Sequence, residues 1–288
     1  MRHARTFIAT ALSVTLAAGA LVGCGGQQES VQNEATQASE AASQSQEELI
    51  AEFKEALAGV PAYKSVTLEV EETSVYPGED SSDDETFTAK TLYKFDASGS
   101  KLRTSAEVSI DKLKLVYYTD GTDAVFVSDG PVYSGTTEQF DLGFADGVED
   151  YLDDAIGDLD DLVAYVDTVE KVEKDGLRLY TLALDADAYA ASDDNLQLLK
   201  DSGTTLAEAQ VSVGFGSDGR IASLGKNLSF EDFSRMTDIL FSDYDNTAVE
   251  AMPKADKTFE QMEADSQAKL DALAAQIDAD EAEDADDD

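Results

Sequence analysis

The residues best able to do chemistry in this sequence lie at its beginning. The chain of 288 residues has one cysteine, Cys24, and one histidine, His3. They belong to a stretch with a basic start, Met1 to Arg5, followed by a short apolar segment, Phe7 to Val22, which is the form of a secretory leader. Loss of this leader would remove His3. The remaining chain would then have no imidazole for a catalytic triad or a common zinc site. Lysine or paired-carboxylate chemistry stays formally open, but we do not expect an enzyme.

The stretch Leu21-Val22-Gly23-Cys24 resembles the lipobox of bacterial lipoproteins. This resemblance implies that residues 1–23 are a signal peptide and that Cys24 becomes a lipidated N-terminus carrying a diacylglyceryl group. Two acyl chains anchor a protein stably, whereas one does so only marginally. The alternatives are an uncleaved anchor or a chance cysteine, but Phe7 to Val22 is shorter than the roughly 20 apolar residues of a spanning helix. We therefore expect the protein on the extracytoplasmic face of the cell membrane, held through Cys24.

The composition is strongly acidic, with 61 Asp and Glu against 20 Lys and Arg and a formal net charge of -41. Such a charge repels nucleic acid, which we exclude as a partner, and favours solubility. The acidic stretches do not supply the ligand spacing and central glycine of a calcium-binding EF-hand loop. We expect no metal and no cofactor, and the sequence names no protein partner.

Periodicity predicts the elements that follow. Residues 24–46 are poor in large apolar side chains and predict a flexible tether. A short amphipathic helix is predicted from Leu49 to Leu57, ended by Gly59 and Pro61. Apolar residues then alternate with polar ones, which predicts strands at 66–71, 87–95, 102–110, 113–117, 124–127, 132–134, 169–172, 177–184, 209–215, 221–224 and 239–244.

Two helical segments interrupt the strands. Apolar residues from Val148 to Val166 keep helical spacing, with Gly157 placed to bend or split that helix. A second helix is predicted near 193–200, capped by Ser192 and stopped by Gly203. After Pro253, residues 254–288 predict an acidic tail that is a lone helix or disordered.

A family resemblance appears in the second half of the chain. The hairpin from Val213 to Ile221 and the closing run Phe241-Ser242-Asp243-Tyr244, followed by Pro253, are similar to lipoproteins of the LolA/LppX type. The resemblance implies an α+β domain over residues 47–253, in which a strongly curved antiparallel sheet forms a half-open barrel with helices on its concave side. In that family the space between sheet and helices can hold acyl chains.

The predicted function is therefore non-enzymatic binding or carriage of an apolar ligand, such as a lipid or a lipid-linked envelope precursor. The alternative is an interaction or sensory module of the cell envelope with a filled core. A ligand-sized apolar pocket of about 300 Å³ or more would favour the first, and a dry, packed interior would favour the second. The predicted wall residues are apolar side chains of the strands and of the main helix: Leu68, Phe87, Tyr93, Phe95, Leu115, Phe126, Leu152, Ile156 and Leu159.

Overall fold

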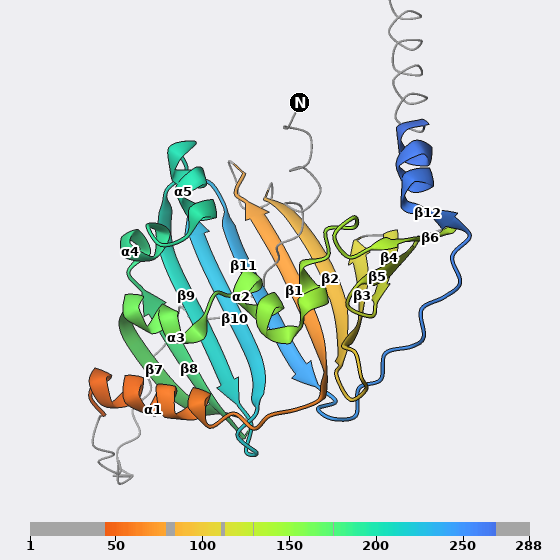
Figure 1. Cartoon of the computed structure of the whole chain (residues 1–288). Coiled ribbons are helices and arrows are strands. Elements are labelled where there is room, and N and C mark those ends of the chain that lie inside the picture. The colour runs from red at the N-terminus through yellow and green to blue at the C-terminus, as the bar shows by residue number, and fades with distance from the viewer. Residues whose placement is uncertain (1–43, 79–83, 111–112, 129, 175, 269–288) are drawn as a thin grey trace, which may run out of the picture.

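The computed structural model describes residues 44–78, 84–110, 113–128, 130–174 and 176–268 (Figure 1). The predicted leader, Cys24, most of the tether and the end of the tail lie outside these residues. The described chain forms one large curved sheet with several short helices.

The alternating segments form 12 strands in a single sheet. Their side chains point in turn to the two faces, and one face is covered by helices, so the apolar positions of each strand share that face. The strands are β1 Ser65–Tyr76, β2 Glu85–Asp96, β3 Arg103–Ile110, β4 Leu113–Thr119, β5 Asp123–Val127, β6 Val132–Thr136, β7 Val166–Lys174, β8 Leu177–Leu184, β9 Leu206–Phe215, β10 Ile221–Phe230, β11 Ser234–Ser242 and β12 Lys257–Thr258.

The sheet consists of two meanders, β1 to β6 and β7 to β11, that join where β1 pairs with β11. The order is β12-β6-β5-β4-β3-β2-β1-β11-β10-β9-β8-β7, so β12 and β7 are the edges and the sheet does not close. The predicted α+β fold with an open, curved sheet and helices on the concave side is confirmed.

One strand pair differs from the predicted antiparallel arrangement. After β11 the chain crosses to the far edge of the sheet, where β12 pairs with β6 in parallel (Figure 1). Phe259 then packs on Phe140 with ring centroids 5.1 Å apart. Residues 259–268 are helical. The sheet therefore includes residues beyond the predicted boundary at Pro253, because an apolar side chain early in the acidic tail finds a partner on the sheet.

Several of the helical segments lie in the connection from β6 to β7. These two strands lie near opposite edges, so residues 137–165 must cross a face of the sheet (Figure 1). The crossing segment contains η1 Gly143–Asp146, α2 Val148–Ala155, α3 Leu159–Leu162 and η2 Val163–Tyr165. The single long helix predicted here is wrong, since Gly157 adopts φ +98°, a left-handed conformation that ends α2. The alternative that Gly157 splits the helix is confirmed.

Two short helices lie above β8 and β9. Helix α4, Ala186–Ala190, was not predicted, and the side chain of Asp185 caps it by accepting from the Ala188 amide. Helix α5, Asp194–Asp201, was predicted, but with the wrong cap: Asp193 Oδ1 accepts from the Leu196 amide, 3.1 Å away. Ser192 instead donates to the Tyr189 carbonyl at the end of α4. Gly203 at φ +98° follows the end of α5, as predicted.

Helix α1, Gln46–Ala58, lies against β7 (Figure 1). A capping box starts it: the Ser45 hydroxyl accepts from the Glu48 amide at 3.2 Å, and Glu48 Oε2 accepts from the Ser45 amide at 2.8 Å. Its apolar side buries Phe53 completely, against Tyr180 of β8 and Phe215 of β9. The helix therefore closes one end of the concave face.

Replacing Ser45 with alanine is expected to destabilise the protein by about 1 kcal/mol, because the Glu48 amide at the start of α1 loses its side-chain acceptor. Urea unfolding would measure the change. Ser100→Ala, an exposed position in the turn after β2, is the matched control and is expected to change the unfolding free energy by less than about 0.5 kcal/mol. Equal effects of the two changes would contradict the role of the capping box.

Candidate ligand-binding face

The helix-covered face of the sheet is defined by aromatic contacts. The Tyr151 ring of α2 lies 4.5 Å from the Tyr93 ring and 6.4 Å from the Phe95 ring, centroid to centroid. Tyr93 and Phe95 pair with Leu68 and Val66 of β1, so these four side chains share the concave face. Every second residue of the central strands points the same way.

Six of the nine predicted wall residues gather in one packed core. Leu68, Phe95 and Ile156 are at most 2% exposed and belong to the large apolar cluster. Tyr93, Leu152 and Leu159 are partly buried against that cluster. The structure thus brings these six together, but as side chains that fill the space below α2 and α3.

The other three lie elsewhere on the same sheet. Phe126 joins an aromatic group toward the β6 edge, where its ring centroid is 4.8 Å from that of Tyr117 and 6.2 Å from that of Phe140. Leu115 is half-buried and lies beside Val108 of β3. Phe87 is 60% exposed. Phe126 therefore belongs to a second packed group, whereas Leu115 and Phe87 border solvent.

Leu115 and Phe87 are part of a larger apolar surface at the open end of the concave face, where β1 and β2 extend past α2 (Figure 1). Phe87 touches Tyr76 of β1, with ring centroids 5.9 Å apart, and Tyr76 in turn stacks on Phe233. Tyr76 is 41% exposed and Leu113 is 45% exposed. We call this surface the open patch, and it consists of Tyr76, Phe87, Val108, Ile110, Leu113 and Leu115.

Three charged side chains lie on the concave face beside the open patch, and the sequence analysis missed them. Glu72 of β1 pairs with Thr237 of β11, and Thr237 pairs with Lys226 of β10, so the three residues form one row. Arg235 lies in the next row and pairs with Ser74 of β1. A signal was present in the sequence: each charge occupies an apolar position of an alternating strand, as in Leu224-Gly225-Lys226-Asn227-Leu228.

Burial shapes the electrostatics of this row. Loss of water raises the pKa of Glu72 from 4.5 to about 8, although the positive charge of Arg235 opposes the shift. Burial also lowers the pKa of Lys226, while Asp193 acts in the opposite direction. Glu72 is therefore mostly protonated at neutral pH, so its carboxyl does not neutralise the positive charge of Arg235 in the next row.

A separate polar network fixes α1 to the edge strand. Glu52 Oε1 accepts from Lys171 Nζ at 2.6 Å and from the Tyr180 hydroxyl at 2.9 Å. The hydrogen bond from Lys171 is the main reason that the pKa of Glu52 is lowered. The Gln46 side chain forms two hydrogen bonds with the backbone of Val169. Its Oε1 accepts from the Val169 amide at 2.6 Å, and its Nε2 donates to the Val169 carbonyl at 3.1 Å, so Gln46 bonds the two groups that a neighbouring strand would bond. This network covers part of the backbone of edge strand β7.

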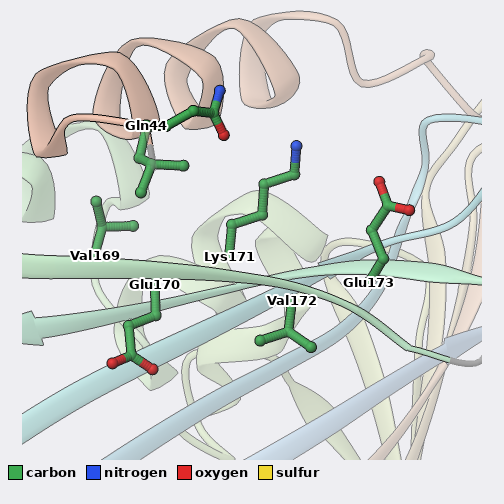
Figure 2. Close-up of a pocket in the computed structure, with 7 residues that line it drawn as sticks. Gln44, Val169, Glu170, Lys171, Val172 and Glu173 are labelled. Carbon is green, nitrogen blue, oxygen red and sulfur yellow. The ribbon is translucent and has the colours of Figure 1, made fainter. Parts of the chain in front are cut away.

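Two surface hollows lie at this end of the sheet. The first, of about 460 Å³, is bordered by Gln44, Leu49 and residues 169–173 of β7. Figure 2 shows Lys171 and Glu173 on the side of β7 that faces α1, with Glu170 and Val172 on the other side. The second, of about 540 Å³, lies between the start of α4 and strands β8 and β9 and contains Asp167, Asp185, Asp187 and Glu208. None of the predicted wall residues borders either hollow.

Within the described ranges, no group of three or more His, Cys, Asp and Glu side chains is placed to hold a metal ion. In the same part of the chain, no helix is long and apolar enough to cross a membrane.

The architecture is that of an open, curved sheet whose concave face is partly filled by crossing helices. Solved structures similar to this chain include the lipoprotein LppX of Mycobacterium tuberculosis, with a TM-score of 0.42 and 13% identity over 72% of this chain and 100% of that one. LprF of Mycobacterium bovis has a TM-score of 0.41 and 12% identity, over 72% of this chain and 95% of LprF. A LolA superfamily protein of Nitrosomonas europaea has a TM-score of 0.24 and 10% identity, over 72% of this chain and 94% of that protein.

No protein-family model and no curated protein matches the sequence. The expected likeness to the LolA/LppX type is thus found among solved structures, at low identity. The function proposed below rests on contacts within this chain.

Proposed function

We propose that this chain is a non-enzymatic, membrane-tethered lipoprotein of the bacterial cell envelope that binds the acyl chain of a lipid-like ligand on its concave face. The observation that carries this proposal is the open patch. Large apolar side chains remain in contact with solvent on the recessed face of the sheet, directly beside the packed core.

The energetics support an acyl ligand. Tyr76, Phe87 and Leu113 are each more than 40% exposed. Covering such surface is favourable by about 25 cal/mol per Å², and each buried CH₂ group of a ligand contributes about 0.8 kcal/mol. A chain of ten or more carbons laid across β1 to β4 would therefore bind without a specific polar contact. Concave apolar surfaces of this kind are the usual sites for small ligands.

The proposed anchor places this face near its ligand. Lipidation of Cys24 would hold the protein at the membrane, and a flexible tether of about 20 residues would reach roughly 25 Å from the surface. Helix α1 is the first described helix after that tether, and it packs on the same face of the sheet as the proposed site. The domain would thus stay within reach of membrane lipids.

A second candidate is a protein-interaction module, and the filled core favours it. Leu68, Phe95 and Ile156, which were expected to line a cavity, are buried in the apolar core between the helices and the sheet. In that case the open patch would be covered by a partner protein instead of a lipid. The two functions differ in whether lipid binds to the isolated protein.

Replacing Phe87 with aspartate is expected to weaken binding of an apolar ligand by at least about tenfold, because the change removes apolar contact and puts a charge in the patch. The measurement is native mass spectrometry of residues 25–288, purified from a lipid-containing cell. Wild type is expected to carry lipid at a defined stoichiometry.

Leu240→Asp is the matched control. Leu240 is 53% exposed on β11, where it pairs with Glu69 and Ser223 and points to the opposite face of the sheet. This control should retain the lipid. A wild-type protein that carries no lipid and takes up none from added vesicles would contradict the carrier function and favour the interaction module.

A further inference from the structure

Charged side chains lie at the centre of the concave face, where the two meanders meet. Glu72, Lys226 and Arg235 come from the adjacent strands β1, β10 and β11. Neighbouring strands are about 4.8 Å apart, so Glu72 and Lys226, on either side of Thr237, are separated by roughly 10 Å. Arg235 is two residues from Thr237, or about 7 Å along β11. The three residues are therefore close on one face of the sheet, where the guanidinium of Arg235 is nearest to Glu72 and the Lys226 ammonium lies 5.7 Å from the centroid of the Tyr189 ring of α4.

One donor of Arg235 lacks a hydrogen-bond partner. Its Nε atom is buried without a hydrogen bond, and its guanidinium forms no ion pair among the described residues. The guanidinium carbon lies 5.4 Å from the centroid of the Phe233 ring, next to the open patch. A buried donor without an acceptor is unfavourable, because nothing replaces the hydrogen bond that it made with water. Among the described residues no acceptor is placed against this donor, so a ligand could supply it.

Two lysines on the convex face of the sheet form ion pairs. Lys90 of β2 forms an ion pair with Glu71 of β1. Lys114 of β4 forms one with Glu107 of β3, with 2.6 Å between Lys114 Nζ and Glu107 Oε1. Acidic side chains are abundant in this protein and neutralise these two lysines. Arg235, in contrast, keeps a buried Nε without an acceptor.

We propose that Arg235, with Lys226 and Glu72 beside it, binds the carboxylate or phosphate headgroup of an anionic amphiphile whose acyl chain lies on the open patch. This proposal rests on the function proposed above and adds the chemical class of the headgroup. Ser74, the neighbour of Arg235 on β1, also pairs with Phe87. A single strand, β1, thus lies between Arg235 of the headgroup site and Phe87 of the open patch.

The net charge of the protein does not prevent this. Charges more than about 8 Å apart across solvent are largely screened at physiological ionic strength, so nearby groups decide the fate of a bound anion. Arg235 offers bidentate donors, and charge-assisted hydrogen bonds of this type are the stronger ones. The acidic surface slows the approach of an anion from solution, whereas the stability of the bound state depends on the local contacts.

Glu72 would make the site sensitive to pH. The groups that interact with it are Arg235 of β11, Tyr93 of β2 and Tyr151 of α2, and Lys226 lies in the same row two strands away. A protonated Glu72 can donate to the headgroup, whereas an ionised Glu72 competes with it for Arg235. Because the pKa of Glu72 is about 8, affinity for an anionic ligand should fall as pH rises from 7 to 9.

The test uses residues 25–288 and three ligands with the same twelve-carbon chain, below their micelle-forming concentrations: laurate, dodecyl phosphate and dodecyl maltoside. Each ligand competes with the neutral apolar dye N-phenylnaphthylamine, whose fluorescence reports occupancy of the apolar surface. The two anionic ligands separate a free fatty acid from a phosphate headgroup. Arg235→Gln removes the cation, and Lys94→Gln, half-buried on the convex face of β2, is the matched control.

We expect the anionic ligands to bind wild type more tightly than the maltoside, and Arg235→Gln to weaken only the anionic ligands, by about tenfold or more. Lys94→Gln should behave as wild type. If Arg235→Gln is poorly folded by circular dichroism, Lys226→Gln and Arg235→Lys replace it; the first should reduce the preference and the second should retain it.

Two results would overturn the proposal. If all three ligands compete equally and no variant changes their ranking, the headgroup site is wrong while the proposed function stands. If the dye itself does not bind wild type, the proposed function fails and the headgroup site fails with it.

Discussion

Replacing Phe53 with alanine is expected to lower the free energy of unfolding by about 3–5 kcal/mol, the usual loss when a fully buried phenylalanine is truncated. Phe53 is 0% exposed, and its ring centroid lies 5.4 Å from that of Tyr180 and 6.3 Å from that of Phe215. These rings come from α1, β8 and β9, so the loss of Phe53 leaves a cavity that several rigid elements enclose. Urea unfolding followed by circular dichroism would measure the change.

Phe87→Ala is the control for this prediction. Phe87 is the same type of residue but is 60% exposed, so its truncation should change the unfolding free energy by less than about 1 kcal/mol. A Phe53→Ala variant as stable as Phe87→Ala would show that α1 is not docked on the sheet as described. The first folded helix after the proposed tether would then be free to move.

The second prediction concerns Glu72→Gln, which should make the protein more stable than wild type at alkaline pH by about 2 kcal/mol, after allowance for partial access to water. Burial raises the pKa of Glu72 from 4.5 to about 8 in the folded state. Between these values the folded protein holds a proton that the unfolded chain releases, so wild-type stability falls as pH rises. Below pH 4.5 both states are protonated, and above pH 8 both are ionised.

The difference between Glu72→Gln and wild type should therefore be small at pH 4.5, grow up to about pH 8, and stay constant above it. Urea unfolding at pH 5, 7 and 9 would trace this profile. Glu69→Gln, exposed on the opposite face of β1, is the control and should give no such profile. A difference that does not depend on pH would show that the Glu72 carboxyl is not held protonated by its surroundings.

Local sequence patterns were sufficient to predict most of the elements. Alternation in Val66-Thr67-Leu68-Glu69-Val70 predicts a strand because the side-chain period depends only on adjacent residues. The turn at Asp218-Gly219 and the break at Gly157 were predicted for the same reason, since a left-handed backbone is a local preference of glycine. The helix at 49–57 was predicted from its spacing, whereas its capping box of Ser45 and Glu48 was not predicted.

Local patterns were not sufficient for the site. Leu68 and Phe87 occupy equivalent apolar positions of neighbouring strands, yet one is fully buried and the other is 60% exposed. The difference depends on where α2 crosses the sheet, which follows from the separation of β6 and β7. The aspartates 185 and 193 likewise became helix caps only because the chain turns there above β8 and β9.

By itself the sequence determined the class of the fold, most of the strands and helices along the chain, and the absence of imidazole after residue 3. Only the tertiary structure decided that β1 pairs with β11, which brings Glu72 close to Lys226 and Arg235, both more than 150 residues further along the chain. Strand pairing over such distances depends on the packing of the whole sheet. The neighbours of a charged residue at an apolar strand position are therefore known only from the folded structure.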